Sequence, residues 1–195
     1  MDNRHQKRLK RYHTPGDLHE LTFSCYLRRP LLEDDGLKVI LCRAVDAANE
    51  RYRIRLVAFV IMPEHVHLLI DPIDAEPDLP GYLAAIKRPS SFRIKQVLID
   101  CGDPSLNGLT VLERPGKTAF RFWQEGAGYD RNITTSKVAL AAVDYLHLNP
   151  VRRALVTRAE DWKWSSCRWY FSDTQIVDPD LPKIHGMRPG FLDDR

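Results

Sequence analysis

The sequence has little cysteine and no long hydrophobic run, and each shortage excludes a class of protein. Only four cysteines occur in 195 residues, they are widely separated, and no CxxC pair is present. A zinc ribbon is therefore not expected, and in a reducing compartment the cysteines are expected to be free thiols. No stretch of about 18 apolar residues occurs, so no membrane-spanning helix is predicted. The four cysteines are Cys25, Cys42, Cys101 and Cys167.

The amino-terminal residues 1–12 are polar and basic and lack the apolar stretch of a secretory signal. Cytoplasmic residence is the default expectation from this absence. Hydrophobic residues make up 44% of the chain, which is enough for a core and argues against a disordered chain. We expect a basic arm over residues 1–12, one folded domain over 13–170 and a weakly patterned tail over 171–195.

The net charge is only +3, but the positive charge is unevenly distributed. The amino-terminal arm carries five cations with no acid between them, whereas pairs such as Arg152–Arg153 are also explained by a solvated surface. Because phosphate contacts dominate affinity for nucleic acids, the arm is the better candidate for such a role. Its cations are Arg4, Lys7, Arg8, Lys10 and Arg11.

Hydrophobic periodicity predicts alternating strands and helices. The order β-α-β-β-α-β with one additional helix is typical of an α+β, ferredoxin-like split β-α-β unit. We expect an antiparallel sheet with helices packed on one face, plus an added C-terminal helix. The expected strands cover residues 21–27, 52–62, 65–70 and 119–124, and the expected helices cover 33–50, 79–100 and 134–149.

Two prolines and one long connection qualify this arrangement. Pro89 is expected to kink or split the second helix, since proline removes a backbone hydrogen bond inside a helix. Pro150 is expected to end the last helix at Asn149, because the residue before proline avoids helical geometry. Residues 101–117 contain repeated glycine and proline and are predicted to form a long loop.

The segment Pro63-Glu64-His65-Val66-His67 pairs two histidines on one strand. Residues i and i+2 of a strand point to the same face, so His65 and His67 project together. Two adjacent imidazoles are a ready pair of metal ligands. The alternative is two hydrogen-bonded histidines on the surface of a sheet.

Tyr145 and Asn149 lie one turn apart on the last predicted helix and therefore on one face. That face also carries Val138, Ala141 and Ala142, and we expect it to point toward the sheet. The alternative is a core tyrosine and an asparagine that caps the helix before its proline.

The histidine pair and the Tyr145–Asn149 pair together predict a metal-dependent catalytic site if the helix lies across the face of the sheet that carries the histidines. Asn149 can then offer an amide oxygen to the metal, with Tyr145 beside its open positions, where a cation acts as a Lewis acid toward phosphate. A phenol has an ordinary pKa of about 10 and is a poor nucleophile unless nearby positive charge favours the phenolate.

The chain resembles the REP-associated tyrosine transposases, relatives of the single-strand insertion-sequence transposases in the HUH endonuclease superfamily. The similarity runs from about Tyr12 to Tyr170, and its motifs are modest alone but specific in this order. The matching segments are Pro15-Gly16, FVIMPEHVHLL at 59–69, RFWQ at 121–124, VDYLHLNPVR at 143–152 and EDWKWSS at 160–166.

The resemblance implies an HUH transposase-like catalytic domain over 13–170 that binds single-stranded DNA with hairpin-forming repeats, as a monomer or a homodimer. It implies that His65 and His67, with Asn149 as third ligand, bind Mg²⁺ or Mn²⁺. It also implies that Tyr145 attacks DNA to form a 5′-phosphotyrosine linkage, from which a 3′-hydroxyl later rejoins the strand. Expected phosphate contacts are Arg8, Lys10, Arg11, Arg121, Arg131, Arg152 and Arg153.

Three alternatives stay open from the residues. The chain could be a catalytically silent DNA-hairpin-binding protein that keeps the transposase fold. It could be a metal-dependent hydrolase that uses water and leaves no covalent adduct. Tyr129 is a rival nucleophile, although it lies outside the helix that carries Asn149.

Overall fold

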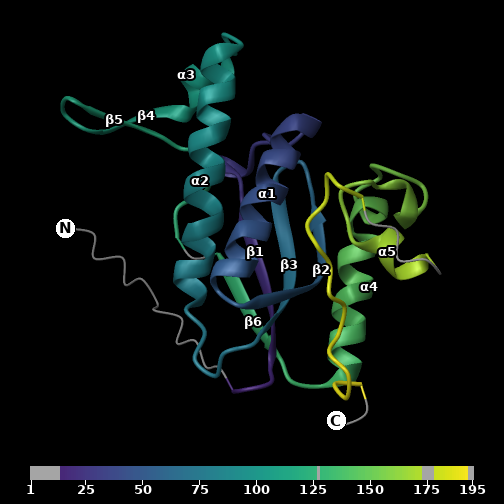
Figure 1. Cartoon of the computed structure of the whole chain (residues 1–195). Helices are drawn as coiled ribbons and strands as arrows, with labels where there is room; N and C mark the ends of the chain where they lie inside the picture. Colours follow the sequence, from purple (N-terminus) through teal and green to yellow (C-terminus); the bar gives the residue numbers. More distant parts are fainter. Residues whose placement is uncertain (1–13, 127, 173–177, 193–195) are drawn as a thin grey trace, which may run out of the picture.

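The computed structural model describes residues 14–126, 128–172 and 178–192, and its centre is a four-stranded antiparallel sheet (Figure 1). The strands stand in the order β2-β3-β1-β6. This arrangement confirms the predicted α+β fold with an antiparallel sheet. The strands are β1 (Leu18–Ser24), β2 (Ile54–Ile61), β3 (His65–Pro72) and β6 (Tyr129–Ile133).

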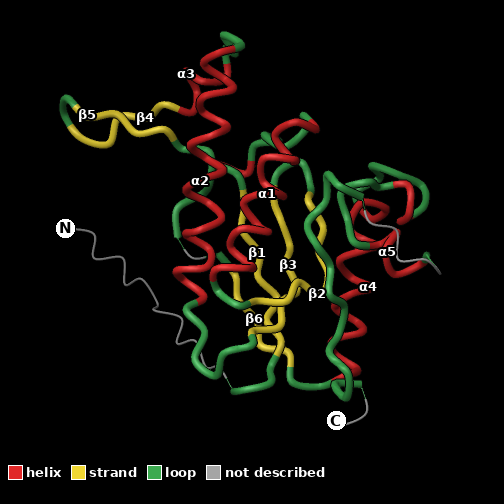
Figure 2. Tube along the Cα trace, viewed as in Figure 1, coloured by secondary structure: helices red, strands yellow, loops and turns green. Residues whose placement is uncertain are grey.

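Helices cover both faces of this sheet. Helices α1 (Asp35–Arg51) and α2 (Leu79–Asp100) pack against each other and share one hydrophobic cluster with the sheet. Helix α4 (Ser136–Arg152) is the added helix, and it packs through a second cluster on the opposite face (Figures 1 and 2). None of the described helices combines the length and apolarity needed to cross a bilayer.

Alternation along β3 divides its side chains between the two clusters. Val66, Leu68 and Ile70 join the cluster under α1 and α2, whereas Leu69 joins the cluster under α4. Since successive side chains of a strand point to opposite faces, His65 and His67 lie on the α4 side. The predicted hairpin between β2 and β3 is confirmed by the antiparallel register of Val60 with His67.

The fourth strand of the sheet is not the predicted one at residues 119–124. Residues 119 and 120 belong to β5 (Lys117–Phe120), which pairs with β4 (Thr110–Arg114). Of the rest, Trp123 forms an isolated antiparallel bridge with Cys25, while β6 takes the sheet position beside β1. Phe122 and Trp123 are both buried, so their apolar character reflects packing into the core. The predicted long loop at 101–117 is therefore wrong too, because it contains α3 (Ser105–Leu109) and β4.

Neither proline ends its helix. α2 runs unbroken through Pro89, where the Ser90 hydroxyl donates to the Ile86 carbonyl at 2.7 Å. α4 continues past the predicted end at Asn149 to Arg152 because Pro150 is buried, so packing outweighs its local preference.

Two ends of the fold differ from the simple pattern. β1 ends at Ser24, whereas the prediction extended it to Leu27, which instead lies in a 3-10 turn (Tyr26–Arg28) with φ 53° and a side chain 66% exposed. Described residues 178–192 of the tail pack back on the body. His185 donates its backbone N–H to Leu56 O at 2.8 Å, and Phe191 joins the cluster under α4. Short helices η2 (Ala159–Asp161) and α5 (Cys167–Phe171) precede this tail.

Candidate metal and tyrosine site

The two histidines of β3 face each other at the sheet surface beneath α4. Both are buried, and Nε2 of His65 lies 3.0 Å from Nε2 of His67. Their ring planes are nearly perpendicular, at 84°. Because two neighbouring strands hold β3 in register, this geometry is set by the sheet and not by a mobile loop.

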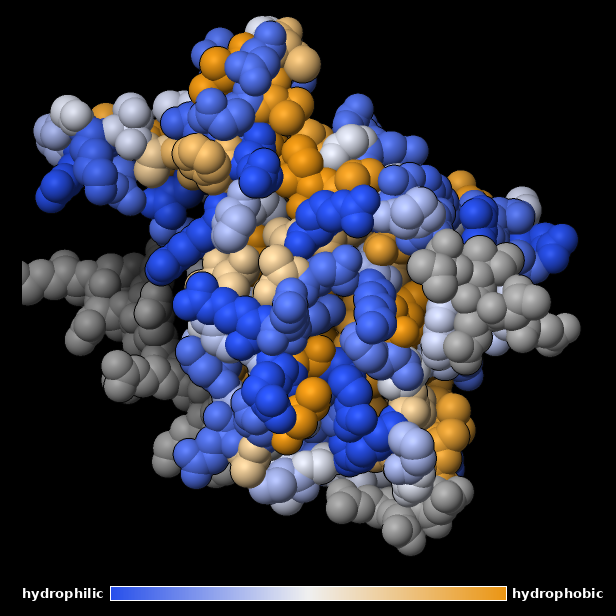
Figure 3. Space-filling view, in the orientation of Figure 1, coloured by the Kyte–Doolittle hydropathy of each residue, from blue (hydrophilic) through white to orange (hydrophobic). Residues whose placement is uncertain are grey.

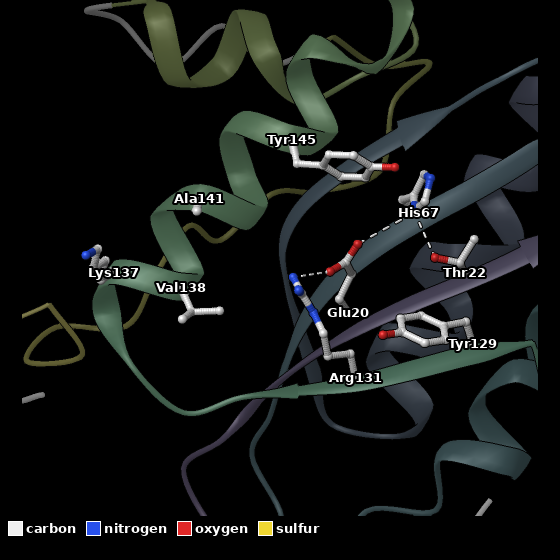
Figure 4. Close-up of a pocket in the computed structure, with 9 residues that line it drawn as sticks. All are labelled: Glu20, Thr22, His67, Tyr129, Arg131, Lys137, Val138, Ala141 and Tyr145. Carbon is white, nitrogen blue, oxygen red and sulfur yellow. Dashed lines mark hydrogen bonds and ion pairs between the residues drawn. The ribbon is translucent and has the colours of Figure 1, made fainter. Parts of the chain in front are cut away.

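Each histidine meets a polar group behind its ring, at Nδ1. Thr22 stands opposite His67 in the β1–β3 register, and its hydroxyl lies 2.8 Å from Nδ1 of His67. A carboxylate oxygen of Glu64 lies 3.3 Å from Nδ1 of His65. Glu20 is more distant, at 3.8 Å from Nδ1 of His67 (Figure 4). This arrangement leaves the two Nε2 atoms turned toward one point.

Burial keeps both imidazoles neutral. It lowers the pKa of His67 to about 3, and the neighbouring His65 adds to that effect. Burial also lowers the pKa of His65, against the opposing effect of the Glu64 carboxylate. A neutral imidazole has one nitrogen lone pair free, which is the form that binds a metal.

The two buried carboxylates behind the rings are each paired with an arginine. Glu64 accepts from Arg153 at 2.9 Å, and Glu20 accepts from Arg131 at 2.6 Å. The arginines are about half exposed, whereas both carboxylates are buried. Each pair therefore neutralises an acid behind the histidines and leaves part of a guanidinium at the surface.

Tyr145 stands beside the histidine pair. Its ring centroid lies 5.8 Å from that of His67 at an interplanar angle of 88°, and its hydroxyl points toward His67 (Figure 4). The guanidinium of Arg152 lies over the tyrosine ring, 5.1 Å from its centroid. Helix α4 begins well before this point, where the side chain of Thr135 caps it by accepting from the Val138 backbone N–H.

The predicted inward stripe on α4 is only partly correct. Ala142 and Asn149 are buried, but Tyr145 is 42% exposed and Val138 is 39% exposed. The buried face is shifted around the helix, so Tyr145 lies at its border. A border position lets the phenol contact a histidine and still be reached from solvent.

A cavity of about 580 Å³ opens between α4 and the edge of the sheet (Figure 4). It presents the Tyr145 and His67 side chains together with the cations Arg131 and Lys137. Glu20 balances the charge of Arg131, so Lys137 leaves the lining with a net positive charge, which suits an anionic ligand. Its lining residues are Glu20, Thr22, His67, Tyr129, Arg131, Lys137, Val138, Ala141 and Tyr145.

Comparison with known proteins finds a family whose model matches part of this chain. Residues 18–103 match the family described as "Transposase IS200 like", a region that contains both histidines and ends before Tyr145. The chain is related to the IS200-like transposases. A Haemophilus influenzae protein described as a REP-associated tyrosine transposase is 27% identical over 117 residues, which cover 60% of this chain and 61% of that relative.

The fold of this chain also matches a solved structure, that of a REP-associated tyrosine transposase bound to a REP hairpin. The TM-score is 0.64 and the sequence identity 20%, over 94% of this chain and 98% of the other. At this identity the likeness establishes the fold, and the ligand named belongs to the other protein.

The geometry of the two histidines fits a cation. With metal–nitrogen distances of about 2.1 Å, two ligands at right angles lie about 3.0 Å apart, which equals the separation of the two Nε2 atoms. In the absence of a cation the same spacing is a hydrogen bond between one protonated and one unprotonated ring nitrogen. The Thr22 hydroxyl at Nδ1 of His67 favours the tautomer of that ring with Nε2 unprotonated, the form in which a histidine binds a metal.

A third ligand is less defined. Among residues 14–126, 128–172 and 178–192, no three His, Cys, Asp or Glu side chains are grouped as a metal site. Asn149 is 7% exposed and lies one turn beyond Tyr145, and within the same residues no hydrogen bond joins its amide to either histidine. Its role as a ligand stays a prediction.

The predicted DNA contacts fall into three groups. Arg8, Lys10 and Arg11 lie outside the described residues. Arg121 forms ion pairs with Glu113 and Glu125 and does not line the tyrosine cavity. The remaining three surround the candidate site through the contacts given above, namely Arg131, Arg152 and Arg153.

Sequence reasoning missed Thr22 and Glu20. Both lie on β1, far along the chain from the histidines, and become neighbours of His67 only through the register of β1 with β3. Their period-two spacing places them on one face of the strand. That spacing was the only available signal, and it did not identify which strand would lie alongside.

Proposed function

We propose that this chain is a metal-dependent single-stranded DNA endonuclease and strand transferase of the transposase type. It would cleave near DNA hairpins through a 5′-phosphotyrosine intermediate and rejoin the ends. The observation that carries the proposal is the position of the Tyr145 phenol, which points toward the paired His67 inside a cation-lined cavity. The REP hairpin bound by the structural relative supports DNA as the partner.

In this proposal His65 and His67 hold a divalent cation, Mg²⁺ or Mn²⁺, with Asn149 as a third donor. When bound, the cation supplies a Lewis acid to the phosphate oxygens. Thr22 acts as a positioning residue because its hydroxyl lies within hydrogen-bond distance of Nδ1 of His67, and the Glu64 carboxylate places negative charge 3.3 Å from Nδ1 of His65.

The covalent step belongs to Tyr145. Its phenolic oxygen forms a bond to phosphorus, the bond from phosphorus to the 3′ oxygen breaks, and the proton lost by the phenol is balanced by protonation of that 3′ oxygen. Arg131 and Lys137 line the same cavity and offer positive charge to the phosphate. Attack by a 3′-hydroxyl on the phosphotyrosine reverses the exchange and rejoins the strand without an external energy source.

Two other functions are outcomes of the same experiment. A hairpin-binding protein without catalysis would bind DNA and leave it uncut. A metal-dependent hydrolase would cut DNA with water and form no covalent adduct.

The test is incubation of the protein with a hairpin DNA that carries a single-stranded extension, in Mg²⁺ or Mn²⁺, followed by a denaturing gel. We expect a covalent protein–DNA species that disappears in Tyr145→Phe, while binding of the DNA persists. We also expect the species to disappear in His67→Ala and in excess EDTA. Cleavage that survives Tyr145→Phe without an adduct would establish the hydrolase, and binding without cleavage would establish the silent binder.

Tyr129→Phe is the matched control. Tyr129 lines the same cavity and is 53% exposed, so the same hydroxyl is removed from the same surroundings. We expect this variant to keep the adduct. If the adduct is lost in Tyr129→Phe and kept in Tyr145→Phe, the nucleophile is Tyr129.

A further inference from the structure

A second groove, of about 350 Å³, lies between α2 and the segment that follows β5. Four of its lining side chains are cationic and none is acidic. In Figure 3, hydrophilic side chains with apolar ones among them cover α2 and the β4–β5 hairpin. The residues lining the groove are Lys87, Arg88, Ser91, Phe92, Lys95, Phe120, Arg121, Phe122 and Trp123.

The exposed face of α2 places an aromatic ring between two cations. Arg88, Phe92 and Lys95 follow the i, i+4, i+7 spacing of one helical face. Ile86 and Ile94 are on the buried face, while Phe92 is 65% exposed. A single exposed phenylalanine is ordinary. Its placement in a groove between cations is a specific arrangement.

Not all four cations are available to a ligand. Arg121 is committed to ion pairs with Glu113 and Glu125. Lys87 donates to the backbone carbonyls of Gln124 and Gly126, at 3.1 and 3.0 Å.

The other two cations are available to a ligand. Within the part of the chain that the structure describes, neither Arg88 nor Lys95 forms an ion pair. Nζ of Lys95 lies 5.9 Å from the ring centroid of Phe120, a contact that leaves its charge unneutralised.

The floor of the groove is fixed, and it lies close in the chain to the tyrosine cavity. Trp123 is buried and donates its indole N–H to the Ser90 hydroxyl at 3.1 Å. The hydrogen bonds from Lys87 hold the backbone shortly before β6. Residues Tyr129 and Arg131 of β6 line the tyrosine cavity. The groove and the cavity are therefore connected in the chain by the short segment that leads into β6.

We propose that this groove binds a single-stranded segment of DNA, with backbone phosphates on Arg88 and Lys95 and a base stacked on Phe92. Sites for single strands combine cations that follow the backbone with aromatic rings on which bases stack. The unneutralised charges of Arg88 and Lys95, in a lining without an acid, favour a polyanion over a protein surface. The proposal rests on the proposed function, because the groove would hold the strand that enters the Tyr145 cavity.

The test measures binding by fluorescence anisotropy in the Tyr145→Phe background with EDTA, so that no cleavage occurs. The probes are a hairpin with a single-stranded extension of about ten nucleotides and the same hairpin without it. We expect Phe92→Ala to weaken binding of the extended hairpin about tenfold and to leave the blunt hairpin unaffected. The double variant Arg88→Gln/Lys95→Gln should reduce the salt slope of binding by about 1.4, the value for two phosphate contacts on a single strand.

Matched controls separate this groove from general effects. Phe171→Ala removes another exposed phenylalanine, 76% exposed, and Arg43→Gln/Arg51→Gln removes two exposed cations from α1. Both controls should bind like the parent. Equal losses in controls and groove variants, losses on the blunt hairpin, or unchanged binding in the groove variants would each overturn the proposal.

Failure of this proposal is distinguishable from failure of the proposed function. The binding assay reports on the groove whether or not the protein cleaves DNA. The adduct is read separately on denaturing gels, with Tyr145 present. If no adduct forms but the protein still prefers the extended hairpin in a groove-dependent way, the protein binds single strands without cleaving them.

Discussion

The Thr22 hydroxyl lies 2.8 Å from Nδ1 of His67, on the side of the ring opposite the atom that faces His65. This contact couples the side chain of one strand to the donor atom of the next. With Nδ1 protonated and donating to the hydroxyl, Nε2 keeps its lone pair toward the paired histidine. The candidate metal site is therefore built from two strands, although both histidines lie on one.

Replacing Thr22 tests this coupling. Thr22→Val keeps the shape of the side chain but removes the acceptor for Nδ1–H, so the tautomer of His67 is no longer held. We expect affinity for Mn²⁺, measured by calorimetry, and the rate of adduct formation to fall about 10- to 100-fold. Thr22→Ser keeps the hydroxyl and should retain most of both. Equal metal affinity in the valine variant and the parent would show that Thr22 does not orient the ring.

The Glu64–Arg153 pair makes a prediction about stability. Arg153→Leu leaves the buried Glu64 carboxylate without its cation. Because Arg153 is half exposed, solvent screens part of the loss, and we expect unfolding free energy in urea to fall by about 1–2 kcal/mol. Adding Glu64→Gln should recover part of that loss. Arg152→Leu is the neighbouring control, since Arg152 contacts the Tyr145 ring and should leave stability nearly unchanged.

A buried hydrogen bond between α1 and α2 predicts a second stability effect. The hydroxyl of Tyr82 donates to Oδ1 of Asn49 at 2.8 Å, and Tyr82 is fully buried. Tyr82→Phe leaves the asparagine oxygen without a donor and should lower the unfolding free energy by about 1–3 kcal/mol. Urea denaturation measures the change, and catalytic readouts should stay normal under native conditions. No loss of stability would mean that water replaces the phenol.

Cysteine reactivity should separate one thiol from the other three. Cys101 is exposed, whereas Cys25, Cys42 and Cys167 are buried. Burial raises the pKa of Cys25 to about 12 and that of Cys167 to about 11, and it raises the pKa of Cys42 as well. Since the thiolate is the reactive form, a thiol reagent at pH 8 should label a single site in the native protein.

The labelling experiment has a direct control. In denaturant all four thiols should react, and Cys101→Ser should remove the fast native reaction. Fast labelling of a second thiol in the native protein would show that a buried cysteine is accessible through local opening.

Local periodicity was sufficient for the helices and for the hairpin that carries the histidines. The two-residue spacing predicted that His65 and His67 share a face, and the observed Nε2 separation agrees. The helical spacing of α2 was predicted with its correct ends, although its proline was expected to break it. These features depend on neighbours within one element, which the chain order displays directly.

The fourth strand could not be assigned in the same way. Residues 119–124 and β6 both have strand-like side chains, and only the pairing of β6 with β1 decided between them. Phe122 and Trp123 fill the core beside α2, and Trp123 adds only an isolated antiparallel bridge to Cys25, just past the end of β1. Strand pairing sums contacts between distant segments, so alternation in one segment does not reveal its partner.

The sequence by itself determined the three long helices, the hairpin of β2 and β3, the shared face of the two histidines and the one-turn spacing of Tyr145 and Asn149, because each follows from the repeat of a strand or a helix. Only the tertiary structure decided that Thr22 lies behind His67, that Arg153 neutralises Glu64 and that Tyr145 lies at the rim of a cavity. Those relationships join residues from separate elements. They follow from strand register and from the packing of α4 on the sheet. Both depend on the free energy of the whole fold, so no single segment predicts them.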